Sequence, residues 1–322
     1  MHRFNPANYW HWLRDRRILS MNRRNAQFIA LWNPRQHYHI VDQKLLTKDI
    51  ALKAGVPVPT TYAVVEQWGE IARTIEHVTR THRTLVIKPN TGSAGRGVLV
   101  LEKDAADVWR RASGRPVSTL DMRYHLASIL SGLYSLSELP DSALIEQRIF
   151  PHEFFGSITW HGTPDLRIIL YRTIPVMAMM RLPTRRSDGR ANLHQGAVGV
   201  GIDIAEGVTV NAVQRSVPVS RHPDTGAPLL GLELPDWQRA LDISRTLASH
   251  IPLQYIGIDL MLDAAHGFLM IEANVRPGLS IQIANNAGLR TRLDFLSAQF
   301  ARGASPDEAW HTFLPRLAAH DL

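Results

Sequence analysis

Apolar residues recur with a helical period in several segments of the chain. Residues 42–54 form the first of these segments, which Gly55 and the prolines that follow it would end. Further helices are expected at 70–81, 235–249 and 294–322. The polar stretch 104–140 is also expected to be helical, with a break where glycine and proline occur close together.

Apolar runs of strand character lie between these helices, and residues 1–43 precede them. The first 43 residues begin with an amphipathic stretch, which predicts a short helical cap. The mixture of helices and strands indicates an α/β (α+β) fold, without internal repeats or a low-complexity linker. Strand-like runs cover residues 61–65, 84–89, 98–101, 143–176, 197–219, 256–260 and 271–279.

The last two strand-like runs carry the most informative polar residues. Residues two apart in a strand point to the same side, so Glu272 and Asn274 are expected to project together. If the two runs pair as a hairpin, Asp259 reaches the same patch. Two carboxylates and an amide are hard oxygen ligands, which suit Mg²⁺, or alternatively Mn²⁺, better than zinc. Edge carboxylates that simply face solvent are the alternative, but unpaired acids in an apolar run are costly.

A glycine-rich loop follows Lys88, at the end of another strand. Three glycines in residues 92–97 let backbone N–H groups approach an anion closely. The chain contains no Walker A string, and the loop joins strand to strand where a dinucleotide fingerprint needs a helix. We therefore expect a hairpin flap that closes over phosphates, rather than a glycine-rich hairpin without a ligand.

Two weaker groups of residues lie in the middle of the chain. The strand 145–149 is able to hold an adenine with main-chain groups, and Glu153, seven residues after Glu146, to take the ribose hydroxyls. Structural salt bridges of Glu146 and Glu153 are the alternative. Arg167 and the segment 190–196 offer two arginines and an amide, which suit phosphate and carboxylate oxygens. His194 alone is more typical of a structural histidine than of a base.

Composition limits the class of protein. The chain has 322 residues and a net charge of +7, and it contains no cysteine, which excludes disulfides and cysteine nucleophiles. Its basic residues are spread out without interleaved aromatic residues, so a polyanionic ligand is favoured and no nucleic-acid partner is expected. Neither a signal-peptide core nor an apolar run of spanning length occurs, so we expect a cytoplasmic protein without membrane insertion.

In their order along the chain, these motifs resemble the ATP-grasp ligases over residues 42–293. Segments 190–196 and 274–279 look most like the ribosomal-protein glutamate ligase branch, and the chain as a whole resembles the bacterial alpha-L-glutamate ligase-like proteins. The resemblance implies an ATP-grasp fold, in which two α+β lobes sandwich ATP. Only about forty residues precede Lys44, so the usual N-terminal domain is absent or replaced by a cap.

The resemblance also implies a division of the chain and a set of ligand contacts. Residues 1–43 would be the cap, 44–145 the lid lobe with its flap and helical insertion, and 146–322 the lobe with the metal and substrate sites. Asp259, Glu272 and Asn274 match the magnesium ligands. The ATP-binding residues would be Lys44, Lys88, Ser93, Ala94, Gly95, Glu146, Arg148, Ile149 and Glu153.

The implied activity is an ATP- and Mg²⁺-dependent carboxylate–amine ligase that forms an amide through an acyl phosphate. An amino acid such as glutamate would be joined to a peptide, a protein or another amine. The enzyme itself would be a possible homo-oligomer. Alternatives are a regulatory nucleotide-binding module and a kinase that stops at phosphoryl transfer. The catalytic residues would be Lys88, Arg167, Arg190 and Asn192, and the substrate residues Arg190, His194, Arg276 and Gly278.

Overall fold

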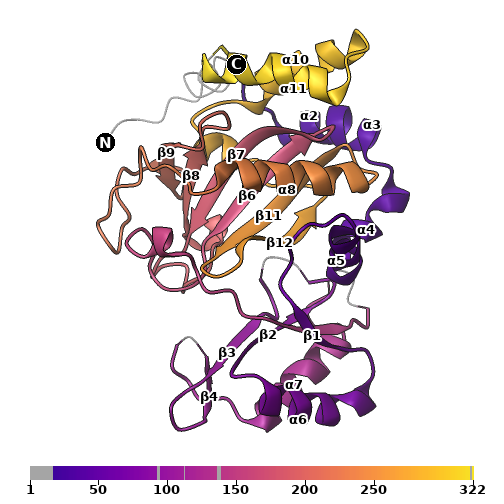
Figure 1. The fold of residues 1–322 in the computed structure, drawn as a ribbon, viewed down its shortest axis with the longest axis vertical. Helices are drawn as coiled ribbons and strands as arrows, with labels where there is room; N and C mark the ends of the chain where they lie inside the picture. The colour runs from indigo at the N-terminus through magenta and orange to yellow at the C-terminus, as the bar shows by residue number, and fades with distance from the viewer. Residues whose placement is uncertain (1–16, 93–94, 112, 136–138, 320) are drawn as a thin grey trace. The chain divides into compact units, whose positions relative to one another are not determined.

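The computed structural model describes residues 17–322, apart from 93–94, 112, 136–138 and 320. The chain forms two compact units, each with its own sheet (Figure 1). Residues 39–150 make up the small unit, and residues 17–38 combine with residues 151–322 in the large unit. The described part of the expected N-terminal cap therefore belongs to the large unit up to Tyr38.

The small unit contains a five-stranded antiparallel sheet with the order β1-β5-β2-β3-β4. Ile71, Ile75 and Val78 recur at helical spacing on α6 and pack in the core with buried strand residues such as Leu85. Its helices and strands are α4 (His39–Asp42), α5 (Lys44–Lys53), β1 (Thr61–Val65), η3 (Trp68–Glu70), α6 (Ile71–Thr81), β2 (Thr84–Pro89), β3 (Leu99–Lys103), β4 (Trp109–Arg111), α7 (Thr119–Leu130) and β5 (Ala143–Glu146).

The described residues of the segment 104–118, which exclude residue 112, are not helical, contrary to the expectation from its polar composition. Asp104 accepts hydrogen bonds from the backbone N–H groups of Ala106 and Val108, which closes a turn after β3. The chain then returns as β4, which pairs with β3. Helix α7 begins only after Ser118, whose side chain forms a capping box with Asp121.

The large unit contains a seven-stranded antiparallel sheet with the order β10-β9-β8-β7-β6-β11-β12. The predicted hairpin is present, since β12 pairs with β11 over its whole length. The strands of this sheet are β6 (Asp165–Tyr171), β7 (Ile174–Leu182), β8 (Val198–Ile202), β9 (Thr209–Gln214), β10 (Val217–Pro218), β11 (Tyr255–Asp263) and β12 (Gly267–Asn274).

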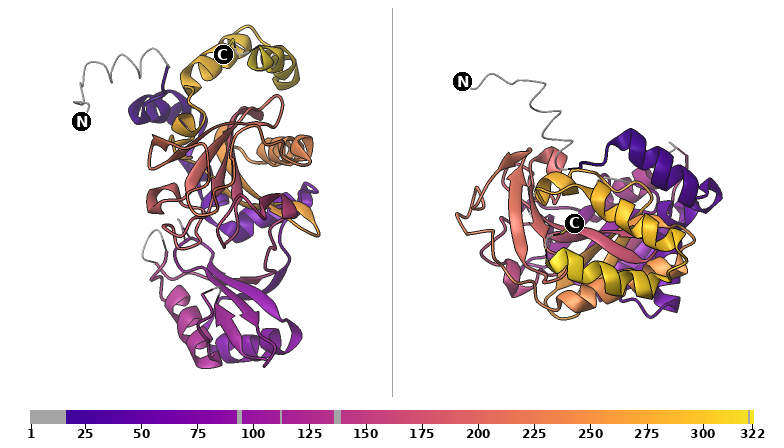
Figure 2. Two further views of the ribbon diagram at one scale, coloured as in Figure 1. Left: turned by 90° about the vertical axis from the view of Figure 1, so that its left-hand side faces the viewer. Right: turned by 90° about the horizontal axis from the view of Figure 1, so that it is seen from above.

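Helices cover both faces of this large sheet (Figure 2). The longest of them, α8, lies along one face and packs against β6, β7, β11 and β12 (Figure 1). The N-terminal helices and α9 lie on the other face. The helices are α2 (Met21–Arg24), η1 (Asn25–Ile29), α3 (Ala30–Trp32), η2 (Arg35–His37), η4 (Glu153–Phe155), η5 (Leu193–Gln195), α8 (Trp237–His250), α9 (Ile281–Ala284), α10 (Leu289–Ala301) and α11 (Pro306–Ala318).

Aromatic packing fixes which sheet face the N-terminal segment covers. The ring of Phe28 lies 5.5 Å from that of Tyr171 and 5.9 Å from that of Tyr255, measured between centroids. These two tyrosines are cross-strand partners on β6 and β11. Because side chains alternate along a strand, Arg167 and Asp259 point to the same face as the tyrosines. We call this the site face.

No helix in the described ranges is long and apolar enough to cross a bilayer.

Candidate functional site

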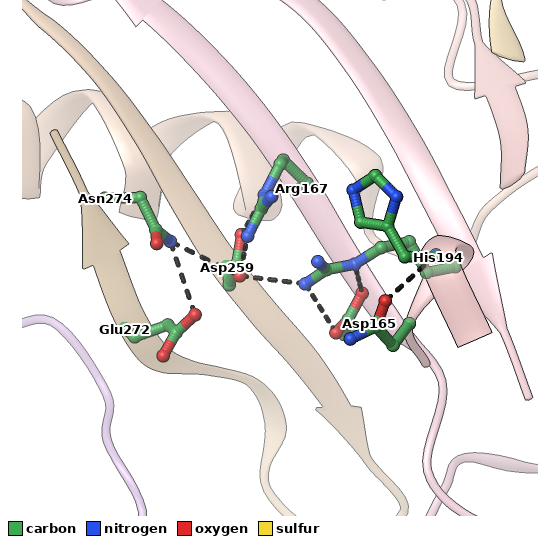
Figure 3. Close-up of polar contacts among 8 residues, drawn as sticks. Asp165, Arg167, His194, Asp259, Glu272 and Asn274 are labelled. Atoms are coloured by element: carbon green, nitrogen blue, oxygen red, sulfur yellow. Dashed lines mark hydrogen bonds and ion pairs between the residues drawn. The ribbon is translucent and has the colours of Figure 1, made fainter. Parts of the chain in front are cut away.

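Four side chains of alternating charge form a chain on the site face (Figure 3). Arg167 donates to both oxygens of Asp259, over 2.7 Å from Nε and 2.5 Å from Nη2. Nη2 of Arg181 donates to the same carboxylate over 2.8 Å and to Asp165 over 2.6 Å. A further bond joins Nε of Arg181 to Asp165. We call these four residues the charge chain.

The strand register brings the charge chain together. Asp165 lies opposite Arg181 across β6 and β7, and Arg167 lies opposite Asp259 across β6 and β11. Cross-strand partners have Cβ atoms about 5 Å apart, which is within reach of a bidentate arginine. These strands are otherwise largely apolar and buried, so each charge needs a partner to remain ionised there.

The environment shifts the two carboxyl groups in opposite directions. Burial raises the pKa of Asp259, but the positive charges of Arg167 and Arg181 outweigh burial and hold that pKa well below its usual range. Burial raises the pKa of Asp165 to about 6. Arg181 lowers this pKa, but the negative charge of Asp259 offsets part of that lowering. Asp259 is therefore the fixed negative charge of the chain.

Strand β12 adds two polar side chains beside Asp259. Glu272 is the cross-strand partner of Asp259, and Asn274 lies opposite Gly257. Nδ2 of Asn274 lies 3.4 Å from Oε1 of Glu272 and 3.5 Å from Oδ2 of Asp259. The three residues predicted as metal ligands thus lie together on one patch. Their role in binding a metal stays a prediction.

The donor set of this patch suits a hard cation. Three or more histidine, cysteine, aspartate or glutamate side chains arranged to hold a metal ion do not occur in the described part of the chain. What the patch offers instead is two carboxylates and an amide oxygen, which fit Mg²⁺ in kind. Asp259 is largely engaged by its arginines, whereas Glu272 and Asn274 are only half-buried. Glu272 and Asn274 therefore have the more accessible ligand oxygens.

The loop after β12 lies against the charge chain. A Cβ atom on Gly278 would lie 4.0 Å from Nη1 of Arg167. Gly257 on β11 makes room for the same loop, because a Cβ atom there would lie only 2.6 Å from Cβ of Pro277. Arg276 is exposed, and its guanidinium lies 5.8 Å from the centroid of the Tyr38 ring. The predicted substrate residues Arg276 and Gly278 thus flank Pro277.

In the small unit, a buried carboxylate lies between two lysines. Nζ of Lys88 is 2.6 Å from Oε2 of Glu146, and Nζ of Lys48 contacts Oε1. Burial alone would raise the pKa of Glu146, but the charges of Lys88 and Lys48 lower it overall. Lys48 also donates to Oγ1 of Thr61 over 2.6 Å. The predicted nucleotide residues Lys88 and Glu146 are therefore in direct contact.

Lys44, the other lysine predicted to contact phosphate, holds the base of the glycine-rich flap. Its Nζ donates to the carbonyl oxygen of Gly92 over 2.5 Å and to that of Asn90 over 3.3 Å. Ser93 and Ala94 lie outside the described residues. Gly95 has a φ of +70°, a backbone conformation that glycine adopts readily.

The remaining residues predicted to bind ATP differ in their surroundings. Arg148 pairs with Glu102 and lies 4.8 Å above the ring of Phe150. Ile149 is buried. Glu153 is exposed and begins η4 in the large unit, whereas Glu146 belongs to the small unit.

Three predicted residues lie in the loop between β7 and β8. Arg190 is exposed, and its backbone N–H donates to Ser187 over 3.1 Å. Asn192 caps η5, because its Oδ1 accepts from the backbone N–H of His194 over 3.0 Å. In Figure 3 the side chain of His194 is drawn toward the Asp165 end of the charge chain, away from Glu272.

Lys48 and Arg181 belong to these clusters but were not among the predicted site residues. Lys48 lies one helical turn after Lys44, and that spacing was an available signal. Arg181 interrupts an otherwise apolar run, which indicates a buried charge but does not identify its partners. Asp165 stands two residues before Arg167 and so shares its face.

Comparison with known proteins places these features in a family. The model of the sugar-transfer associated ATP-grasp family matches residues 23–297, which is most of the chain. No curated protein sequence matches. The chain is similar in structure to biotin carboxylase from Campylobacter jejuni, with 14% identity and a TM-score of 0.51 over 83% of this chain and 47% of that one.

Two further solved structures match at lower TM-scores. The ATP-grasp ligase PsnB complexed with its minimal precursor is 15% identical with a TM-score of 0.44, over 83% of this chain and 64% of that one. D-cycloserine synthetase DcsG is 15% identical with a TM-score of 0.48, over 81% of this chain and 71% of that one. The chain thus spans less than two thirds of the PsnB chain. From the family match and the fold, the chain belongs to the sugar-transfer associated ATP-grasp family and has the ATP-grasp fold.

Proposed function

We propose that the protein is an ATP- and Mg²⁺-dependent carboxylate–amine ligase. In the first step, a substrate carboxylate oxygen would attack the γ-phosphorus of ATP, giving an acyl phosphate and releasing ADP. In the second step, an amine would attack the acyl carbon, forming the amide and releasing phosphate and a proton. Family membership supports ATP chemistry of this kind, and the substrates are part of the proposal.

The first step brings two anions together, and this sets the main electrostatic demand on the protein. A pair of unit charges about 4 Å apart costs on the order of 4 kcal/mol at an effective dielectric of about 20. Fixed positive groups lower that cost in the transition state without reorganising. The charge chain is the observation that carries the proposal, because it holds Arg167 rigidly on Asp259, whose carboxylate lies 3.5 Å from Nδ2 of Asn274.

A bound Mg²⁺ would neutralise phosphate charge and orient the γ-phosphoryl group. We assign its binding to Glu272 and Asn274, with Asp259 as a further ligand. The half-buried state of Glu272 and Asn274 supports this assignment. So does the patch's composition of hard oxygen donors, which disfavours zinc.

The small unit would contact the nucleotide. We assign Lys88 and Lys48 to its phosphate oxygens, and Lys44 to the flap whose carbonyls it already holds. The buried Glu146 would hold the ammonium groups of Lys88 and Lys48 in place until a phosphate competes for them. Arg148, Ile149 and Glu153 remain candidates for contacts with adenine and ribose.

The substrate residues would select the acyl and amine groups. Arg190, Asn192 and His194 lie on one exposed or half-exposed loop, and Arg276 follows the metal patch. We propose an amino acid, with glutamate as one candidate, as the acyl donor. A peptide, a protein or another amine would be the acceptor.

The test is an ADP-release screen with pairs of amino acids and peptides, in the presence of Mg²⁺, followed by mass spectrometry of the products. A ligase gives ADP release that requires both substrates, and a product whose mass is the sum of the two substrate masses minus one water. A kinase gives ADP release without an amine, together with a stable phosphorylated product. Nucleotide binding without turnover for every pair would contradict both enzymes and support a regulatory module.

A further inference from the structure

In the described part of the chain, two guanidinium groups near the end of β12 have no acidic partner. Arg24 is 6% exposed and donates to the carbonyl oxygen of Pro277 over 2.8 Å, and to Oδ1 of Asn25 over 3.1 and 2.9 Å. Arg276 is exposed and lies above Tyr38. Within the described ranges, no carboxylate forms an ion pair with Arg24 or Arg276. Arg167 and Arg181 on the site face, by contrast, each pair with a carboxylate of the charge chain.

The two positive groups are close enough to affect each other. Burial lowers the pKa of Arg24, and the charge of Arg276 lowers it further, against an opposing effect of Tyr255. A buried cation without a counter-ion is costly, and arginine remains charged. The local field is therefore positive and would favour an anion beside Arg276.

The N-terminal segment that carries Arg24 is firmly docked on the large unit. Asn33 bonds to the backbone of Tyr255 in both directions, donating over 2.6 Å and accepting over 3.0 Å. Gln282 likewise bonds to Leu19, accepting from its N–H over 2.8 Å and donating to its carbonyl oxygen over 3.1 Å. These buried hydrogen bonds position Arg24 and Tyr38 against the loop after β12.

We propose that residues 17–38 form one wall of the substrate site, and that Arg276 binds a carboxylate group of the substrate there. Arg24 is the positioning residue: it holds Pro277, and with it the loop in which Gly278 lies against Arg167 and Arg276 lies over Tyr38. Tyr38 supports the Arg276 guanidinium from below, as aromatic rings do for arginine. This inference rests on the proposed function and names the residues that would recognise its anionic substrate.

Steady-state kinetics give the first test. We expect Arg24→Met to raise the KM for the carboxylate substrate about tenfold or more, with the KM for ATP changed less than twofold. Arg24→Lys keeps the charge and one donor and should recover part of this loss. The matched control is Arg23→Met, at a neighbouring position whose guanidinium pairs with Asp294 over 3.3 Å. Equal changes in both KM values for Arg24→Met would overturn the positioning role.

Chemical labelling gives a second test that requires no turnover. Phenylglyoxal modifies exposed arginines, and mass spectrometry of peptides reports the rate at Arg276. Succinate, as a simple dicarboxylate probe, should slow labelling of Arg276 at least threefold in the wild type and in Arg23→Met. That protection should be lost in Arg24→Met and in Tyr38→Leu but kept in Tyr38→Phe.

The two proposals fail in different ways. Absence of ADP release with every substrate pair would overturn the ligase, while labelling still decides the anion site. Labelling of Arg276 that succinate does not slow in the wild type would overturn the anion site. Full protection in both Arg24→Met and Tyr38→Leu would overturn it as well. If Arg24→Met does not fold, Tyr38→Leu and Arg24→Lys decide the result.

Discussion

Arg181 reaches across β6 to Asp259, with 2.8 Å between Nη2 and Oδ2, and the same guanidinium neutralises Asp165. We expect Arg181→Met to destabilise the fold strongly, because it leaves two buried carboxylates without their shared cation. Removing one partner of a buried ion pair typically costs about 3–5 kcal/mol. The free energy of unfolding from urea titration measures this loss.

A compensating change separates charge from packing in that result. Asp165→Asn in the Arg181→Met background removes one of the two carboxylates and should recover part of the lost stability. If the double variant is no more stable than Arg181→Met alone, packing rather than charge explains the loss.

Glu272→Gln should remove activity and leave the fold intact. Glu272 is half-buried, and its contact with Asn274 is long at 3.4 Å, so little stability depends on it. Loss of one carboxylate ligand should lower the rate of ADP release about 100-fold or more at fixed Mg²⁺. A thermal melt within a few degrees of wild type is the control, and near-normal turnover would refute the metal assignment.

Lys48→Met and Lys44→Met should have different effects. Lys48 is buried against Glu146, so its loss should cost about 3 kcal/mol of stability in addition to activity. Lys44 holds flap carbonyls and is only half-buried, so its loss should cost about 1 kcal/mol or less and mainly raise the KM for ATP. Urea titration and ADP-release kinetics on both variants provide the comparison, and equal stability losses would contradict it.

The ionisation of Glu146 should make the free energy of unfolding depend on pH. The pKa of this carboxyl is lowered from its ordinary 4.5 in the folded protein by Lys88 and Lys48, which outweigh burial. Its stabilising contribution is therefore present above about pH 4.5 and is lost as the pH falls below that value. We expect Glu146→Gln to be less stable at pH 7 and to lose less stability between pH 5 and 3 than the wild type. Parallel curves for the two proteins would contradict this.

Gly257→Ala should displace the loop after β12, although residue 257 lies on β11. A Cβ atom at this position would lie 2.6 Å from Cβ of Pro277, so the loop must shift. We expect reduced ADP release together with a loss of about 1–3 kcal/mol in stability. Gly69→Ala is the control, because nothing lies within 4 Å of its added atom. Equal stability and equal ADP release in the two variants would argue against the close approach of Gly257 and Pro277.

Local patterns in the sequence predicted much of the fold. The period of two in strands placed Glu272 and Asn274 on one side, and the turn between the two runs predicted the hairpin that brings Asp259 to them. Helices α6 and α8 follow from apolar spacing. The strand β4 was missed, because its three residues become a strand only by pairing with β3. Its polar sequence carries no local sign of that partner.

The site was harder to predict where it depends on pairing between distant strands. Arg181 joins Asp165 and Asp259 because β7, β6 and β11 lie side by side in the sheet. The spacing of residues along the chain does not predict this strand order. Arg24 is separated from Pro277 by more than 250 positions, so its contact requires the tertiary fold. Lys48 is the exception, since a helical turn from Lys44 would have identified it.

The large unit is assembled from two pieces of chain, residues 17–38 and residues 151–322, with the whole small unit inserted between them. During translation the small unit leaves the ribosome as one uninterrupted stretch, and it is therefore expected to fold first. Strand β11, to which Asn33 bonds, is synthesised more than 200 residues after Asn33. The backbone groups of β11 that Asn33 contacts are therefore missing until the chain is almost complete, so docking of residues 17–38 is expected to be a late step of folding.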